Sequence, residues 1–234
     1  MLLAPVHLVA LNRPWRPAGR VETHSDVSVL RSRTFFAAAA AGTLVTLAEY
    51  ASLISLVPLV LARGSSAATA AWVLGLGGAG QVAGRLAYPA LSRGLGTRMR
   101  VSTISGAVAL TIAALAIVPG PAVLLVLLSV LAGAARGLFT LVGATIVSDL
   151  WGAARFASLN GAFGAPLAVG SALGPLAGAW IAQMVGGFPI CFVVLALAAT
   201  AGAVLFAAAI PDGATGAHTM PDRDPVVDRL PENS

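Results

Sequence analysis

The sequence has no lysine and one cysteine, and only 10% of its 234 residues are charged. Soluble domains carry about 25% charged residues. Because 58% of the chain is hydrophobic, a water-soluble fold could not bury so much apolar surface. Cys191 lies inside an apolar stretch and has no second cysteine for a disulfide. The composition therefore indicates a protein whose helices lie in lipid.

Histidine is absent from every long apolar run, since the three histidines are His7, His24 and His218. A zinc site within the membrane is therefore excluded. An intramembrane serine protease would need serine with histidine, and a metalloprotease would need two histidines around a glutamate. We therefore predict no enzymatic activity, no metal and no cofactor. Nucleic-acid binding is also disfavoured, because the 14 arginines stand in short segments and form no continuous patch.

Six apolar runs follow residue 33, each near the roughly 20 residues that a transmembrane helix requires. They cover residues 35–61, 67–91, 101–118, 122–147, 156–185 and 188–210. The connections between them are short and contain glycine or proline, which favour turns. The predicted fold class is therefore all-α, a polytopic membrane protein with about six transmembrane helices in residues 34–210.

The two ends of the chain differ from this central part. Residues 1–11 are apolar but too short to span a bilayer. We interpret them as the end of a preceding helix, followed by a cytoplasmic loop up to residue 33; an arbitrary apolar start is the alternative. Residues 211–234 are rich in proline and aspartate, which predicts a disordered tail.

Arginine placement predicts the orientation in the membrane. Twelve arginines lie on one side of the predicted spans, Arg63 alone lies on the other, and Arg136 falls within a span. Positively charged residues concentrate in cytoplasmic segments. We therefore expect a multi-pass protein of the cell membrane with both termini in the cytoplasm.

Two charges lie inside predicted membrane helices, Glu49 in the first and Arg136 in the fourth. A charged side chain at the bilayer centre costs at least about 2.5 kcal/mol. From the helical rise, each residue is roughly 20 Å from its end of the span, so both lie near the midplane. One interpretation is a substrate- or proton-handling pair in a polar cavity. The other is a structural pair that fixes helix packing.

Two further groups of residues are candidates for helix packing or gating. In the fifth run, Gly170, Gly174 and Gly178 recur every fourth residue and share one face, where small residues permit close contact. Near the cytoplasmic side, Arg85 or Arg93 is a candidate partner of Asp149. That pairing predicts a structural latch, with an ordinary solvated surface as the alternative.

The order of these features resembles the major facilitator superfamily. The first-helix motif of that family, an acid followed nine residues later by proline, is matched by Glu49 and Pro58. Its loop motif is partly matched by residues 84–98, with Tyr88 where aspartate is expected. Its fourth-helix motif is matched by Arg136 and Gly137. The fifth-helix motif is matched throughout, by Gly161, Gly170, Gly174, Pro175 and Gly178.

The resemblance implies an alternating-access carrier of a small solute, and the fifth-helix motif is typical of proton-coupled exporters. The loop motif and the apolar start make the chain similar to the C-terminal half of such a carrier. The expected partners are a small-molecule solute, the lipid bilayer, and either a missing N-terminal half or a second copy. The alternative is a membrane fragment or scaffold protein that transports nothing.

Overall fold

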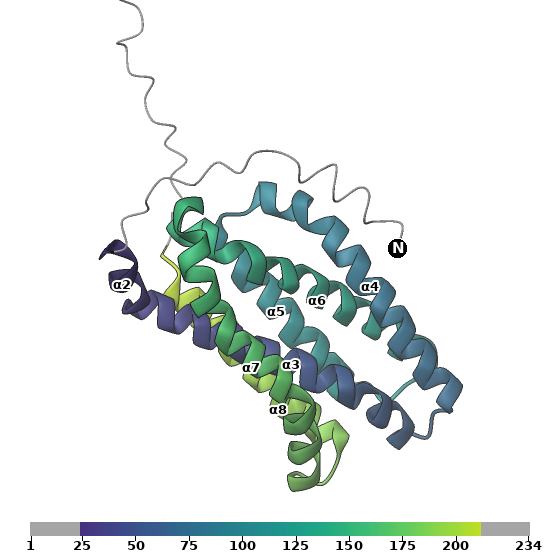
Figure 1. The fold of residues 1–234 in the computed structure, drawn as a ribbon. Coiled ribbons are helices and arrows are strands. Elements are labelled where there is room, and N and C mark those ends of the chain that lie inside the picture. Colours follow the sequence, from purple (N-terminus) through teal and green to yellow (C-terminus); the bar gives the residue numbers. More distant parts are fainter. Residues whose placement is uncertain (1–23, 212–234) are drawn as a thin grey trace, which may run out of the picture.

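The computed structural model describes residues 24–211, and the regular structure in this range is entirely helical (Figure 1). The predicted all-α class is therefore confirmed. The six long helices are α3 (Arg33–Ala62), α4 (Ala67–Gly94), α5 (Thr97–Ile117), α6 (Ala122–Trp151), α7 (Phe156–Met184) and α8 (Phe188–Ala209). The predictions of a preceding helix end at residues 1–11 and of a disordered tail from residue 212 onward lie outside the described residues.

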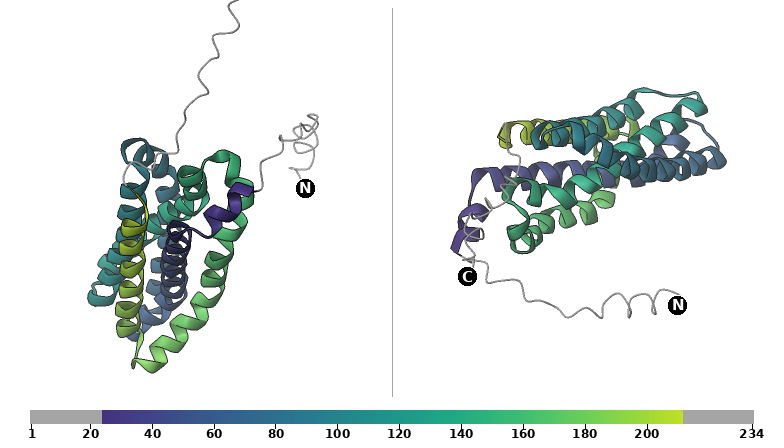
Figure 2. Two further views of the ribbon diagram at one scale, coloured as in Figure 1. Left: turned by 90° about the vertical axis from the view of Figure 1, so that its left-hand side faces the viewer. Right: turned by 90° about the horizontal axis from the view of Figure 1, so that it is seen from above.

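The long helices run roughly side by side along a common direction (Figure 2). Within residues 24–211, five helical segments are long and apolar enough to cross a membrane. Four of them are α3, α5, α6 and α8, and the fifth is α7 with the short turn Ala153–Arg155 before it. The remaining long helix, α4, has 28 residues, which span about 42 Å. It is less apolar because it is rich in glycine and contains Gln81 and Arg85.

The ends of the helices follow from local sequence. Ser32 and Ser66 cap the starts of α3 and α4, where their hydroxyls accept hydrogen bonds from the backbone N–H groups of Phe35 and Thr69. Helix α6 ends at Gly152, whose φ of 86° is a left-handed conformation that glycine adopts without strain. These breaks lie where the sequence predicted connections.

A short helix, α2 (His24–Leu30), occurs in the stretch predicted as a loop. Its last residues, Val29 and Leu30, are partly buried against the hydrophobic core. Packing of these two apolar side chains therefore stabilises a helical turn that the polar composition of the surrounding segment concealed.

The helix contacts divide the bundle into two related units of three helices. Helix α3 packs against α7 and α8, whereas α6 packs against α4 and α5, and α5 and α8 contact each other. Exchanging α3 with α6, α4 with α7 and α5 with α8 reproduces the same set of contacts. The exchange maps the consecutive helices α3, α4 and α5 onto α6, α7 and α8, which is the pattern expected of two three-helix repeats with inverted topology.

Glycines permit the closest helix contacts in both units. On α7, a Cβ added to Gly174 would lie 2.6 Å from the Cβ of Tyr50, and one on Gly178 would lie 2.6 Å from the Oγ of Ser55. Gly170 faces the same helix, α3, whereas Gly161 has nothing within 4 Å of an added Cβ. The three-glycine face predicted from the sequence is therefore the α3–α7 contact.

The equivalent contact between α4 and α6 is also made through glycine. A Cβ added to Gly80 or Gly84 would collide with the backbone of Val130 or Ala134. In the opposite direction, a Cβ on Gly137 would collide with the carbonyl oxygen of Gln81. Backbones that approach this closely gain packing contacts that larger side chains would prevent.

Candidate translocation cavity

A cavity of about 200 Å³ lies between helices α3, α6 and α7. Its walls combine apolar side chains with a carboxylate, a phenol and three hydroxyl groups. The lining residues are Thr46, Glu49, Tyr50, Phe139, Thr140, Gly143, Leu167, Ala168 and Ser171. An apolar cavity with a few convergent polar groups is the usual form of a small-molecule site.

Glu49 is the one charged residue among the lining residues of this cavity. It lies in the middle of α3, next to the buried residues Ala48 and Ala51, and only 3% of its surface is exposed. Its Oε1 has no hydrogen-bond partner among the described residues. Leaving a buried carboxylate oxygen without a partner is costly.

Arg136 lies next to this cavity on α6, one turn before Thr140. It precedes Thr140 by four residues and Gly143 by seven, so it shares the face of α6 on which these two residues line the cavity. Among the described residues, Arg136 forms neither an ion pair within 4 Å nor a hydrogen bond through its buried Nε. The structure therefore places the two sequence-predicted charges on helices that border the same cavity but leaves them unpaired.

The hydroxyl oxygens of Thr140 and Ser171 in the cavity can still accept hydrogen bonds. Thr140 donates a hydrogen bond of 2.9 Å to the carbonyl oxygen of Arg136, and Ser171 donates one of 2.8 Å to that of Ala168. A hydroxyl that donates its proton within its own helix keeps oxygen lone pairs that can accept from a ligand. With Glu49, the cavity therefore offers acceptors from three different helices.

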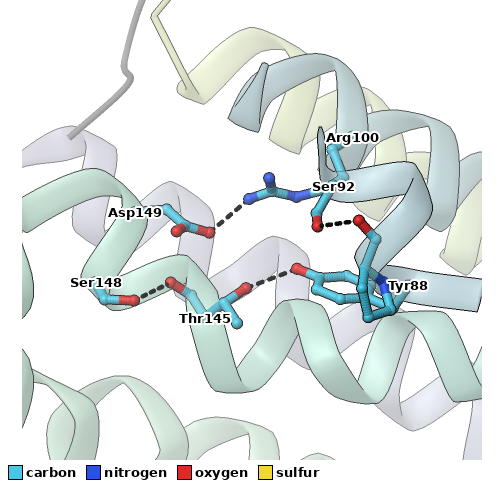
Figure 3. Close-up of polar contacts among 7 residues, drawn as sticks. Tyr88, Ser92, Arg100, Thr145, Ser148 and Asp149 are labelled. Carbon is cyan, nitrogen blue, oxygen red and sulfur yellow. Dashed lines mark hydrogen bonds and ion pairs between the residues drawn. The ribbon is translucent and has the colours of Figure 1, made fainter. Parts of the chain in front are cut away.

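A second polar cluster lies where α4, α5 and α6 meet (Figure 3). The guanidinium of Arg100 donates to the Asp149 carboxylate over 2.5 Å. The hydroxyls of Tyr88 and Thr145 are 2.7 Å apart, and Arg100 lies 5.8 Å from the centre of the Tyr88 ring. The cluster thus joins the last turns of α4 and α6 to the first turn of α5.

The partner of Asp149 is therefore Arg100, in place of the expected Arg85 or Arg93. Those two arginines are exposed on α4, whereas the α4 face toward α6 carries Gly84 and Tyr88. Arg100 is in the first turn of α5, which packs against α6. Its position directly before the apolar run that begins at residue 101 was the available signal in the sequence.

We expect Arg100→Met to lower the free energy of unfolding by about 2 kcal/mol. The substitution leaves the partly buried Asp149 without its partner, and a charge-assisted hydrogen bond contributes about 1.5–3 kcal/mol. Arg93→Met is the matched control, because exposed substitutions change stability by about 0.5 kcal/mol or less. Thermal unfolding of the purified chain measures both, and equal stabilities of the two variants would contradict the latch.

Arg63 has a structural role at the opposite end of the bundle. Its guanidinium donates hydrogen bonds of 2.6 and 2.8 Å to the carbonyl oxygens of Leu115 and Ala116. These residues form the last turn of α5, where carbonyl groups lack partners within the helix. The residue that follows α3 therefore caps α5 and joins the two helices.

In residues 24–211, no group of three or more histidine, cysteine, aspartate or glutamate residues is placed to hold a metal ion.

A comparison with protein-family models agrees with this architecture. No curated protein matches the chain. The family model described as Major Facilitator Superfamily matches residues 34–227, which cover the six long helices except the first residue of α3. The chain is therefore a multi-pass membrane protein that belongs to the Major Facilitator Superfamily, a family of membrane transporters.

Proposed function

We propose that this chain moves a small solute across the cell membrane by alternating access, through the cavity between α3, α6 and α7. The observation that carries the proposal is the buried Glu49, whose Oε1 has no partner in the described structure although it lines a cavity. Ionisable residues within membrane helices commonly mark substrate or proton pathways. The nearby Arg136 supplies the opposite charge.

Proton-coupled efflux is the proposed mode of transport. Glu49 would take up the proton on one side of the membrane and release it on the other. The match of Gly161, Gly170, Gly174, Pro175 and Gly178 to the exporter motif supports the direction. Pro166 and Pro175 lie inside α7, where missing backbone donors allow the helix to bend as the cavity opens and closes.

A second six-helix unit is proposed to complete the cavity, either an N-terminal half or a second copy of the chain. Tyr50 lines the cavity but is 42% exposed, so this wall is open. On α4, a Cβ added to Gly75 or Gly78 would meet nothing within 4 Å. A glycine-rich face suits contact with another helix better than contact with lipid.

The proposed orientation, with both termini in the cytoplasm, is tested with single cysteines at the two ends of α4. We expect Ser65→Cys to react with an impermeant thiol reagent added outside intact cells, and Gly94→Cys to react only after the membrane is opened. Both variants carry Cys191→Ala, which removes the buried native thiol. The reverse pattern would contradict the orientation.

Transport itself is tested with the purified chain in liposomes that contain a pH-sensitive dye. We expect at least one small solute to cause proton movement that liposomes without protein do not show. If no solute in a panel of amines, carboxylates, amino acids and sugars moves protons or is itself transported, the alternative of a non-transporting fragment or scaffold is favoured.

A further inference from the structure

The charges beside the cavity restrict the chemistry of the solute. Glu49 lines the cavity and Arg136 lies one helical turn before Thr140, which also lines it, but the two charged groups form no ion pair within 4 Å. The carboxylate Oε1 and the guanidinium Nε are both buried without a hydrogen-bond partner. A ligand that pairs with both groups would remove the cost of leaving two charges unsatisfied in a low-dielectric interior.

We propose that the cavity binds a small zwitterion that carries an ammonium group and a carboxylate, with an apolar side chain, as in an aliphatic amino acid. This inference rests on the proposed function, because it names the solute class of the same cavity. The ammonium group binds Glu49 and the carboxylate binds Arg136.

The hydrogen-bonding groups fit an ammonium ion at the Glu49 side. An ammonium has three donors and no acceptor. The cavity presents the Glu49 carboxylate together with the oxygens of Thr140 and Ser171, whose own protons are already donated within their helices. These acceptors come from α3, α6 and α7, so they surround the cavity instead of lying along one wall.

Net charge argues against a simple amine or a simple carboxylate. When Glu49 and Arg136 are both ionised, their charges cancel, so either of those ligands would add one uncompensated charge to the interior of the membrane. A zwitterion leaves the occupied site neutral and pairs each charge of the protein with an opposite one. The remaining walls, which include Phe139, Leu167 and Ala168, suit an aliphatic side chain.

Three compounds with nearly the same carbon skeleton test the proposal: leucine, 3-methylbutylamine, which lacks the carboxylate, and 4-methylpentanoate, which lacks the amine. Alanine, ethylamine and propionate form a second set of smaller compounds, which tests the same preference if leucine is too large for the cavity. Binding is measured at pH 7 as the rise in unfolding temperature of the purified chain in lipid nanodiscs, since a ligand of the folded state stabilises it by mass action.

We expect the zwitterion in at least one set to produce its stabilising shift at a concentration at least tenfold lower than the amine or the carboxylate of that set. This comparison uses the unmodified protein, so it does not depend on a variant that folds. Equal or tighter binding of the amine or the carboxylate in both sets would overturn the proposal. Absence of any shift with all six compounds would overturn it as well.

Two variants test which charged group of the ligand binds Glu49 and which binds Arg136. Glu49→Gln should shift the preference toward 4-methylpentanoate, because Arg136 alone remains, and Arg136→Met should shift it toward 3-methylbutylamine. Arg93→Met, outside the cavity, should leave the preference unchanged. Unchanged selectivity in both cavity variants would overturn the assignment. If sugars or other uncharged solutes are transported while no zwitterion binds, this inference fails and the proposed transport function stands.

Discussion

Replacing Glu49 with glutamine is expected to reduce proton-coupled transport to the level of liposomes without protein, with the normal amount of protein in the membrane. Glutamine has nearly the shape of glutamate but cannot bind and release a proton. It also costs less to bury than a charged carboxylate, so folding should not suffer. Solute-driven proton movement, measured together with membrane abundance, checks both parts of this result.

Arg136→Met and the double variant separate a functional pair from a structural one. If the two charges serve transport, Glu49→Gln and the double variant are both abundant and inactive. If they only stabilise helix packing, each single variant loses abundance because it leaves one buried charge uncompensated, and the double variant largely restores it. Normal proton-coupled transport in Glu49→Gln would contradict the proposed coupling role.

Gly84→Leu is expected to have the largest effect on stability, a loss of about 3 kcal/mol or more. Gly84 lies where α4 contacts α6, and an added Cβ would collide with the carbonyl oxygen of Ala134. Because the obstacle is backbone, it cannot be relieved by rotating a side chain, so the two helices must separate. Overpacking of this kind typically costs about 1–3 kcal/mol and occasionally more.

Gly78→Leu is the matched control for this substitution. Gly78 is in the same helix, but an added Cβ there would meet nothing within 4 Å. The control therefore carries the same change in helix propensity without the collision. Thermal unfolding of the purified chain as a monomer, without the proposed second six-helix unit that Gly78 would face, should show a large loss for Gly84→Leu and a small change for Gly78→Leu. Equal losses would show that the α4–α6 contact is looser than the structure has it.

The fold could be predicted from the sequence because lipid imposes simple requirements. Six long runs of suitable residues, separated by glycine and proline, predicted the six long helices. The face of α7 with Gly170, Gly174 and Gly178 was predictable because residues that recur every fourth position share one face of a helix. The glycines of α4 fall at both exposed and buried positions, among them Gly78 and Gly84. Composition alone therefore did not identify the face that contacts α6.

The charged residues show the same limit of sequence-based prediction, which gives the position along a helix but not the partner of a side chain. Depth along a helix follows from residue number, which predicted that Glu49 and Arg136 lie at similar levels; in the structure they form no ion pair within 4 Å. Partner choice depends on the direction in which each helix faces. Sequence reasoning therefore assigned Asp149 to arginines on α4, although Arg100 of α5 forms the ion pair.

Access of water to the cavity is the most direct test of the account, and cysteine labelling at Thr140 measures it. Thr140 lines the cavity, whereas Leu110 on α5 is 70% exposed on the bundle surface outside it. In a Cys191→Ala background, Thr140→Cys should react with a water-soluble thiol reagent, and Leu110→Cys should not, because lipid covers it. If Thr140→Cys is as unreactive as Leu110→Cys, the space between α3, α6 and α7 is not a solute path and the central claim is wrong.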